Sequence, residues 1–293
     1  MTPGGFASPW EHLRLLSDPD RNRALITLLE RHAPGATVAE VGCGTGLLSL
    51  VAAKLGARKV WAIEPTEMAE VAEQVVRDNG LGGVIEVLPS RIEDLEPRPV
   101  DLAFSELLNA DPFYEGVVSA MAAARRWVGP PGRLAPRRLR VYAAVVAAPD
   151  SAREARLAGA EVRGLGERFG LRLDGLLEAL AIDESYRYFS ADDEVVSSSA
   201  LVWDVALGED DEPPDEVVVE VTPTRPGPAA GALVWFESEL DDGLVLTNAP
   251  GRADHWGRLV CAWGEERGLR TDTPVRLRVT LDDDEVDVAW GDP

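Results

Sequence analysis

The chain has 293 residues and 45% of them are hydrophobic, which is enough for two modest domains or one large one. Its 51 acidic and 29 basic residues give a formal net charge of −22. That charge argues against a general nucleic-acid binder, because phosphates are neutralised by a basic surface. It would speed the encounter with a cationic partner such as a basic peptide, or serve solubility alone.

Several classes of protein are excluded by what the sequence lacks. Its first residues show no basic segment followed by an apolar one, so no secretory signal is expected. The longest apolar run, Val141 to Ala148, is too short to span a bilayer. Cys43 and Cys261 offer neither a disulfide framework nor a metal-ligand spacing. We expect a cytoplasmic protein with no metal, no membrane partner and no nucleic-acid partner.

The first half of the chain alternates helix-like and strand-like segments. Apolar residues recur at helical spacing over residues 21–31, 47–55 and 68–76. Short apolar runs typical of buried strands stand between and after them, at residues 36–41, 60–63, 84–88 and 100–104. This order predicts a mostly parallel sheet covered by helices on both faces.

The pattern changes at the breaker cluster Gly129-Pro130-Pro131-Gly132. Short strand-like segments separated by turn signals follow, at residues 139–147, 216–221, 232–237, 259–263, 275–281 and 285–290. Their spacing favours a sandwich or barrel. We therefore expect an α/β, Rossmann-like domain over residues 1–136 and an all-β, barrel-like domain over 137–293. A helical, charged stretch at 150–181 is inserted in the second domain.

Three glycines, Gly42, Gly44 and Gly46, follow a predicted strand and open a predicted helix. Such glycines allow a tight turn and let the backbone approach a ligand closely. A dinucleotide fingerprint would place glycine or alanine where this chain has Leu47, so a smaller adenosyl ligand fits better than a pyrophosphate. Glu64, after the next strand, is placed to accept hydrogen bonds from both ribose hydroxyls. The alternative is a glycine turn in an ordinary α/β domain.

Two glutamates, Glu106 and Glu115, follow the last predicted strand of the first domain. A guanidinium carries five donors in a flat fork and stays protonated at ordinary pH, so two carboxylates can bind two of its edges. If both face one pocket, the expected guest is an arginine side chain. Without a guest the two carboxylates repel each other, which should raise one pKa. The alternative is a pair of solvated loop glutamates in an acidic chain.

These motifs, in this order, resemble the protein arginine methyltransferase family over nearly the whole chain, from about His12 to Trp290. Residues 38–49 are similar to the family's S-adenosylmethionine loop, and Glu64 to Ala69 to its ribose-binding segment. Residues 105–115 look like its double-glutamate loop. Asp254-His255-Trp256 resembles its Thr-His-Trp loop, with a different first residue. The resemblance implies a doubly wound methyltransferase domain with S-adenosylmethionine as cofactor.

The resemblance also implies roles for individual residues. The cofactor would be bound by His12, Arg21, Gly42, Cys43, Gly44, Gly46, Glu64, Ile92 and Glu93. The substrate arginine would contact Glu106, Glu115, Tyr114 and Trp256, with Phe113 as a further candidate for an aromatic wall. The alternative is that these aromatic residues belong to the core. The catalytic residues would be Glu106 and Glu115, joined by Asp18 and His255, through which the proton could leave.

Two segments bear on substrate access and assembly. Only Met1 to Trp10 precede the element that begins near His12, so the aromatic lid helix usual in the family is shortened or rebuilt. Residues 150–181 lie where the family inserts its dimerisation arm, and Phe169 to Leu173 resembles part of that arm. We therefore expect a homodimer.

The leading hypothesis is an S-adenosylmethionine-dependent N-methyltransferase that acts on arginine in a protein or peptide. A second enzyme hypothesis keeps the cofactor and changes the acceptor to a small cationic or guanidino metabolite. A third is a catalytically silent, methyltransferase-like scaffold, against which the presence of Glu106, Glu115, Glu64 and Arg21 argues. The sequence does not distinguish a monomethyl product from a symmetric or asymmetric dimethyl product.

Overall fold

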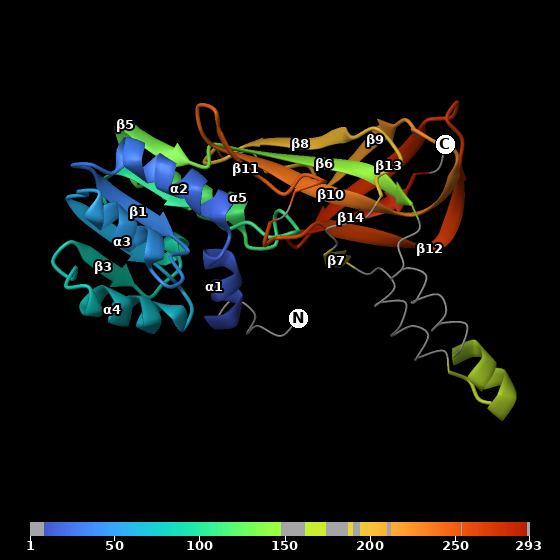
Figure 1. Cartoon of the computed structure of the whole chain (residues 1–293), viewed down its shortest axis with the longest axis horizontal. Helices are drawn as coiled ribbons and strands as arrows, with labels where there is room; N and C mark the ends of the chain where they lie inside the picture. Colours follow the sequence, from blue (N-terminus) through green and yellow to red (C-terminus); the bar gives the residue numbers. More distant parts are fainter. Residues whose placement is uncertain are drawn as a thin grey trace.

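The computed structural model describes residues 9–147, 162–173, 187–189, 194–209, 212–252 and 254–291. Within these ranges an N-terminal α/β domain lies beside a domain of antiparallel strands (Figure 1). No helix in the described ranges has both the length and the apolar character needed to cross a membrane.

The first domain is built on a five-stranded parallel sheet in the order β3-β2-β1-β4-β5, as the alternation of helices and strands predicts. Its strands are β1 (Thr37–Val41), β2 (Lys59–Ile63), β3 (Ile85–Leu88), β4 (Val100–Ser105) and β5 (Val128–Ala135). The chain order reverses between β1 and β4, so the sheet is doubly wound.

Helices cover both faces of this sheet. They are α2 (Pro19–His32), α3 (Leu47–Lys54), α4 (Met68–Asp78), the short η2 (Ile92–Asp94) and α5 (Val117–Arg125), and α1 (Pro9–Leu16) precedes them. Successive strand residues point to opposite faces. Val38 and Leu102 pack with α2, α3 and α4, whereas Ala39 and Ala103 pack with α5 and η2. The sheet is therefore buried on both sides.

The breaker cluster Gly129-Pro130-Pro131-Gly132 lies inside β5, the last strand of the parallel sheet, and the antiparallel strands follow it. β5 is the outer strand of the sheet, and an outer strand tolerates proline because only one of its edges is paired. The register against β4 shifts between Val100 and Leu102, which absorbs the irregular backbone. The chain passes to the second domain at β6.

The second domain consists of antiparallel strands, as predicted. Its strands are β6 (Arg138–Ala147), β7 (Arg187–Phe189), β8 (Ala200–Ala206), β9 (Glu216–Val221), β10 (Gly227–Asp241), β11 (Leu244–Thr247), β12 (Leu259–Leu269), β13 (Val275–Asp282) and β14 (Glu285–Trp290). Six form one sheet in the order β7-β12-β10-β6-β8 with β11 on β10, and β14-β13-β9 form another. The described strands thus make two sheets rather than one closed barrel.

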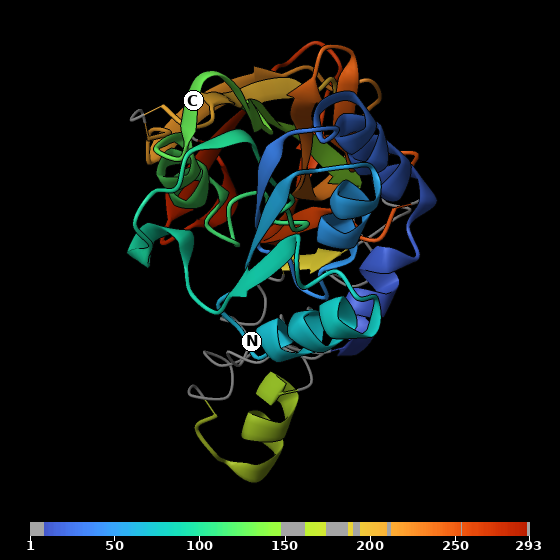
Figure 2. The ribbon, with the colours of Figure 1, turned by 90° about the vertical axis from the view of Figure 1, so that its left-hand side faces the viewer.

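Residues 162–169 form a helix that projects away from both domains (Figures 1 and 2). Most of the remaining stretch 150–181, predicted to be an arm, falls outside the described residues. So do residues 1–8, most of the segment for which a shortened or rebuilt lid is expected.

Candidate active site

The candidate site lies at the carboxyl ends of β1 and β4, where the strand order of the parallel sheet reverses. Ligands bind at this point of doubly wound sheets, in the crevice outside the strand ends. The glycine loop, residues 42–46, follows β1, and the glutamate loop, residues 106–115, follows β4. The topology therefore brings the two predicted halves of the site together.

The glycine loop is approached closely by side chains from other elements. Gly42, Gly44 and Gly46 have φ values of 73°, 52° and 77°, which favour glycine. A Cβ added to Gly42 would lie 2.6 Å from Cδ2 of Leu107, and one added to Gly44 would lie 2.6 Å from Cε1 of His12. His12 thus lies over the loop that the resemblance assigns to the cofactor.

Glu64 is fixed beside the glycine loop. Its side chain is buried, and Oε2 accepts a hydrogen bond from the backbone N–H of Gly44 at 2.8 Å. Oε1 accepts from the backbone N–H of Thr66 at 3.0 Å and from the Thr66 hydroxyl at 2.6 Å. The carboxylate is therefore fixed beside the glycine loop, and its contact with a ribose stays a prediction.

The other predicted cofactor residues lie around the same loop in different roles. Cys43 is buried, and burial raises the pKa of its thiol well above the ordinary value. Ile92 is a core residue packed with Ile63, so only its backbone can face a ligand. Glu93 is partly exposed and accepts a hydrogen bond from Arg91 at 3.4 Å. Its role in cofactor binding stays a prediction.

Glu40 is a further candidate site residue that the sequence did not single out. It lies on β1 just before the glycine loop, is 4% exposed, and accepts a hydrogen bond from the Ser49 hydroxyl. Burial raises its pKa to about 8, although the Ser49 bond and the charge of Arg21 act the other way. A carboxyl group among the apolar residues of a buried strand was the signal that could have identified it.

Glu106 is bonded through both oxygens. The Arg21 guanidinium donates to Oε2 from Nε at 2.6 Å and also forms an ion pair through Nη2. The Trp256 indole N–H donates to Oε1 at 3.1 Å. One predicted substrate carboxylate is thus bound to the arginine predicted to hold the cofactor, and both are buried.

Glu115 has a different environment. Its Oε1 accepts a hydrogen bond from Nδ2 of Asn109 at 3.2 Å. Burial, followed by the charge of Glu106, raises the pKa of Glu115 to about 8, against the opposing effects of Asn109 and Arg21. The direction agrees with the expectation that two neighbouring carboxylates raise one pKa.

Asp18 links α2 to the segment that carries His255. Its Oδ1 caps the helix by accepting from the backbone N–H groups of Asp20 and Arg21, each at 3.0 Å. Its Oδ2 accepts from the His255 backbone N–H at 3.1 Å and lies 2.9 Å from His255 Nδ1. Burial acts to raise the pKa of Asp18, but the hydrogen bonds from Arg21 and His255 outweigh it and lower that pKa.

The predicted aromatic residues separate into site and core. Trp256 contacts Glu106, as described, and Tyr114 is partly exposed in the glutamate loop. Phe113 is 1% exposed and packs edge-on against Trp203 at 5.5 Å between ring centroids. The wall interpretation is therefore wrong for Phe113, which anchors the loop in the second domain.

Asp111 provides a further anchor. It is buried, and its Oδ2 accepts a hydrogen bond from the backbone N–H of Val286 on β14 at 3.0 Å. The glutamate loop is therefore held by both domains. No pattern in the sequence pairs these two positions, which lie far apart in the chain.

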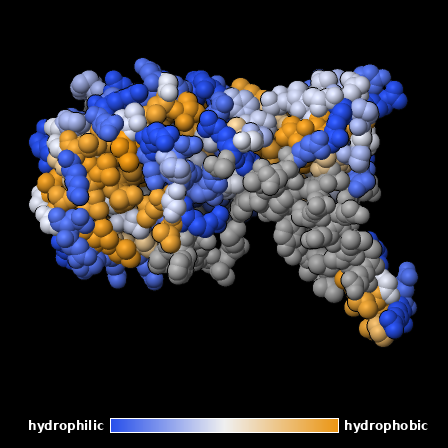
Figure 3. All heavy atoms as spheres, in the orientation of Figure 1, coloured by the Kyte–Doolittle hydropathy of each residue, from blue (hydrophilic) through white to orange (hydrophobic). Residues whose placement is uncertain are grey.

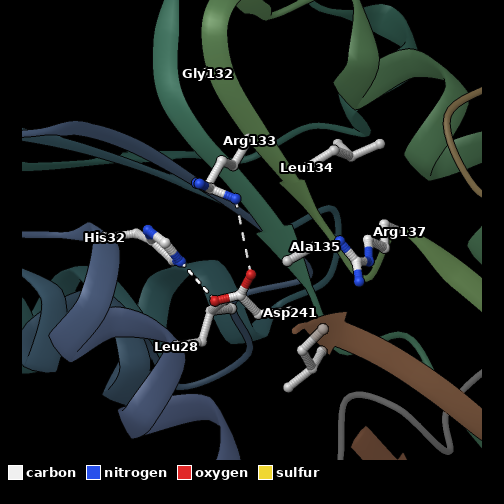
Figure 4. A pocket seen from close by; sticks show the side chains of 9 residues that line it. Leu28, His32, Gly132, Arg133, Leu134, Ala135, Arg137 and Asp241 are labelled. Atoms are coloured by element: carbon white, nitrogen blue, oxygen red, sulfur yellow. Dashed lines mark hydrogen bonds and ion pairs between the residues drawn. The ribbon is translucent and has the colours of Figure 1, made fainter. Parts of the chain in front are cut away.

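A separate cavity of about 200 Å³ lies at the other end of α2 (Figure 4). It is lined by Leu28, His32, Gly132, Arg133, Leu134, Ala135, Arg137, Leu240 and Asp241. None of these is a predicted site residue. His32 Nε2 lies 2.8 Å from Oδ2 of Asp241, across the junction of the two domains.

Comparisons with known proteins agree with this fold. A family model described as ribosomal protein L11 methyltransferase (PrmA) matches residues 22–115. The arginine N(omega)-methyltransferase of Streptomyces achromogenes subsp. streptozoticus is 28% identical over 257 residues, 85% of this chain and 69% of that relative. Protein arginine N-methyltransferase 1 of Caenorhabditis elegans is 38% identical over 115 residues, 37% of this chain and 33% of the relative. The chain thus matches a third of the latter protein's length.

Solved structures show the same architecture. Protein arginine methyltransferase 10 of Arabidopsis thaliana aligns over 94% of this chain and 88% of that one, with a TM-score of 0.78 and 22% identity. A chain of the PRMT1 enzyme–prozyme heterotetrameric complex of Trypanosoma brucei, solved with AdoHcy, aligns over 97% and 92% with a TM-score of 0.80 and 20% identity. At such identities the likeness establishes the fold.

Proposed function

We propose that this chain, which belongs to the protein arginine N-methyltransferase family, transfers a methyl group from S-adenosylmethionine to the guanidinium of an arginine in a protein or peptide. One observation carries the proposal. Glu106 and Glu115 lie in one loop at the switch point of the sheet, beside the glycine loop that the resemblance assigns to S-adenosylmethionine.

The residues at the glycine loop fit that cofactor. Glu64 presents a buried carboxylate beside Gly44, which suits the two hydroxyls of a ribose. Arg21 supplies a buried cation that suits a carboxylate. When bound, S-adenosylmethionine supplies a methyl group on a positively charged sulfur.

The residues of the chain bind and orient the acceptor. Glu106 and Glu115 would contact guanidinium nitrogens and draw positive charge toward them, which leaves the target nitrogen richer in electrons. Binding a cation also relieves the repulsion between the two carboxylates. Most of the acceleration would come from orientation and electrostatics. We assign the Asp18–His255 pair to positioning, with proton transfer through it as a further prediction.

The decisive variants are Glu106→Gln and Glu115→Gln. Each keeps the shape of the side chain and removes its charge, so methyl transfer should fall by about 10²–10³-fold, a loss typical of removing one electrostatic contact to the reacting group. Calorimetric binding of S-adenosylmethionine should be retained by Glu115→Gln. The matched control is Glu73→Gln, on the exposed face of α4, which should behave as the original chain. Near-normal activity of either site variant would refute the proposal that Glu106 and Glu115 bind and polarise the substrate guanidinium.

A small guanidino metabolite is a second candidate acceptor. The relative that aligns over 85% of this chain is named for arginine, without the word protein. Incubation with S-adenosylmethionine and a panel of arginine peptides, free arginine and other guanidino compounds, read by mass, separates the two classes. We expect the peptides to be methylated. Methylation of free arginine alone would favour the metabolite, and cofactor binding without any transfer would favour the silent scaffold.

We further propose a homodimer. The projecting segment exposes Phe169 and Leu171, which are 61% and 59% exposed, and the first domain exposes Leu13, which is 52% exposed. Figure 3 shows apolar side chains gathered both on the first domain and at the tip of the projecting segment. A second copy can cover one apolar surface with the other. Light scattering at micromolar concentration should give twice the mass of one chain, and a monomer would overturn this proposal.

The cytoplasmic location expected from the sequence stays a prediction. Fractionation of cells that produce the chain from its own gene would test it.

A further inference from the structure

The glutamate loop carries the amide side chain of Asn109 between Glu106 and Glu115 in the sequence. Oδ1 of Asn109 accepts a hydrogen bond from the backbone N–H of Ala110 at 2.7 Å. Its Nδ2 donates to Oε1 of Glu115 at 3.2 Å. A reversed amide would place its NH₂ group against the Ala110 N–H and its oxygen against a carboxylate. The orientation of Asn109 is therefore set by its two partners.

The carboxylates of Glu106 and Glu115 have different hydrogen-bond partners. Glu106 receives Arg21 on one oxygen and Trp256 on the other. Within the described part of the chain, Glu115 receives Asn109 on Oε1, and no donor lies within hydrogen-bond distance of Oε2. A guanidinium that reaches the glutamate loop can therefore bind Oε2 of Glu115 without displacing a described partner.

Binding of a guanidinium by the two glutamates depends on Glu115 being ionised. A guanidinium has only donors, so a protonated carboxyl, which is itself a donor at one oxygen, binds it poorly. Burial and the neighbouring charge of Glu106 both favour the protonated form of Glu115. A donor held against Oε1 favours the ionised form, and Asn109 is that donor.

We propose that Asn109 is a positioning residue for the acceptor: it holds Oε1 of Glu115, favours the ionised carboxylate beside Glu106, and leaves Oε2 for the guanidinium. The inference rests on the proposed function and goes beyond it, because it assigns a task to a neutral residue that contacts neither cofactor nor reacting nitrogen. It predicts that the acid limb of the pH profile depends on residue 109.

Two variants separate this role from a purely structural one. Asn109→Asp keeps an oxygen to accept the Ala110 N–H but removes the donor to Glu115 and adds a like charge. Asn109→Ala removes both contacts. If Asn109 only shaped the loop, Asn109→Ala would lose activity equally at every pH, with the Glu115 titration midpoint unchanged. If it positions Glu115, both are impaired and Asn109→Asp is the worse.

The first readout is kcat/KM against pH with the methylated substrate. Loss of one hydrogen bond to a charged group should move the acid limb of Asn109→Ala upward by about one pH unit, so activity at neutral pH falls about tenfold and recovers at higher pH. Asn109→Asp should shift further in the same direction. The matched control is Asn79→Asp, at the exposed C-terminal end of α4, which makes the same charge change and should keep the original profile.

The second readout does not require methyl transfer. The side-chain carboxyl carbon of Glu115, labelled with ¹³C and assigned by its absence in Glu115→Gln, can be titrated in the free protein. We expect its midpoint to rise in both Asn109 variants and to stay unchanged in Asn79→Asp. Unchanged midpoints in both Asn109 variants would overturn the inference even if the chain methylates arginine. If no acceptor is methylated, the proposed function fails while the titration still decides the role of Asn109.

Discussion

Helix α2 is joined to the antiparallel domain at both ends by an aspartate–histidine pair. One pair lies beside the candidate site, and the other lies at a domain junction away from it. At the N-terminal end the acid, Asp18, is on the helix and His255 is on the other domain, with Oδ2 and Nδ1 2.9 Å apart. At the C-terminal end His32 is on the helix and Asp241 is on the other domain, 2.8 Å apart. An acid at the start of a helix complements the helix dipole, as does the cation of Arg31 in the last turn of α2.

The difference lies in what the remaining atoms of each aspartate contact. The second oxygen of Asp18 binds the backbone of Arg21, whose guanidinium binds Glu106. The second oxygen of Asp241, Oδ1, instead lies 3.8 Å from Nη1 of Arg133, while Arg31 shares Oδ2 with His32, and Asp241 lines a cavity without a predicted site residue. The same pair of residue types therefore orients the candidate site at one end of α2 and fixes only the domain junction at the other.

The largest expected effect comes from Asp18→Asn. Asparagine caps helices about as well as aspartate, so α2 should remain stable. The new NH₂ group, however, would face the N–H groups of His255, and the displaced helix start would move Arg21 away from Glu106. We expect kcat/KM to fall roughly 100-fold, as for an angstrom-scale misplacement, with a nearly unchanged melting temperature. The control is Asp20→Asn, an exposed neighbour paired only with Arg23, which should keep full activity.

Asp241→Asn should give the opposite result. It leaves His32 and Arg31 without an anionic partner at a half-buried junction, which should lower the free energy of unfolding by about 1–3 kcal/mol. Because the junction contacts no predicted site residue, kcat/KM should stay within about threefold of the original value. Denaturant unfolding and initial rates measure the two quantities. A large loss of activity with unchanged stability would remove the distinction between the two ends of α2.

A smaller effect concerns pH. Burial alone would raise the pKa of Asp241, but hydrogen bonds from His32, the Asp242 backbone and Arg31 hold it at about 2, below its ordinary 3.8. A lowered pKa in the folded state means that ionised Asp241 stabilises the fold above pH 3.8, and that this contribution is lost as the pH falls through about 2. The stability difference between the chain and Asp241→Asn should therefore be constant near neutrality and shrink below pH 3.8. A difference that grew on acidification would contradict the ion-pair account.

The parallel sheet was predictable because its signals are local. Each buried strand is a short apolar run, each covering helix has apolar residues at helical spacing, and their alternation permits little besides a parallel sheet. The course of β5 through Gly129-Pro130-Pro131-Gly132 was not predictable, since a proline is tolerated only once the strand is known to lie at an edge.

The candidate site was predictable to the extent that its residues follow strands. The glycine loop and Glu106 come directly after β1 and β4, so their proximity follows from the sheet. Asn109 gave no signal, because its role depends on the distance to one oxygen of Glu115. Phe113 was misjudged, since an aromatic residue beside a polar loop can face either a pocket or a core, and only Trp203 decides which.

The hydrogen bond between Asp111 and the backbone of Val286 ties the glutamate loop of the parallel-sheet domain to β14 of the antiparallel domain. Both domains therefore shape the candidate acceptor site. A fragment that stopped after Ala135 would contain the glycine loop and both glutamates but would lack Trp256 and the strand that holds the loop. We expect such a fragment to keep the glycine loop that could bind a nucleoside. The side chains of Glu106 and Glu115 would lose the contacts that orient their loop. The parallel-sheet domain alone therefore lacks part of the candidate acceptor site. We expect that exchanging the antiparallel domain for that of a relative would alter substrate choice, even if every residue of the parallel-sheet domain were kept.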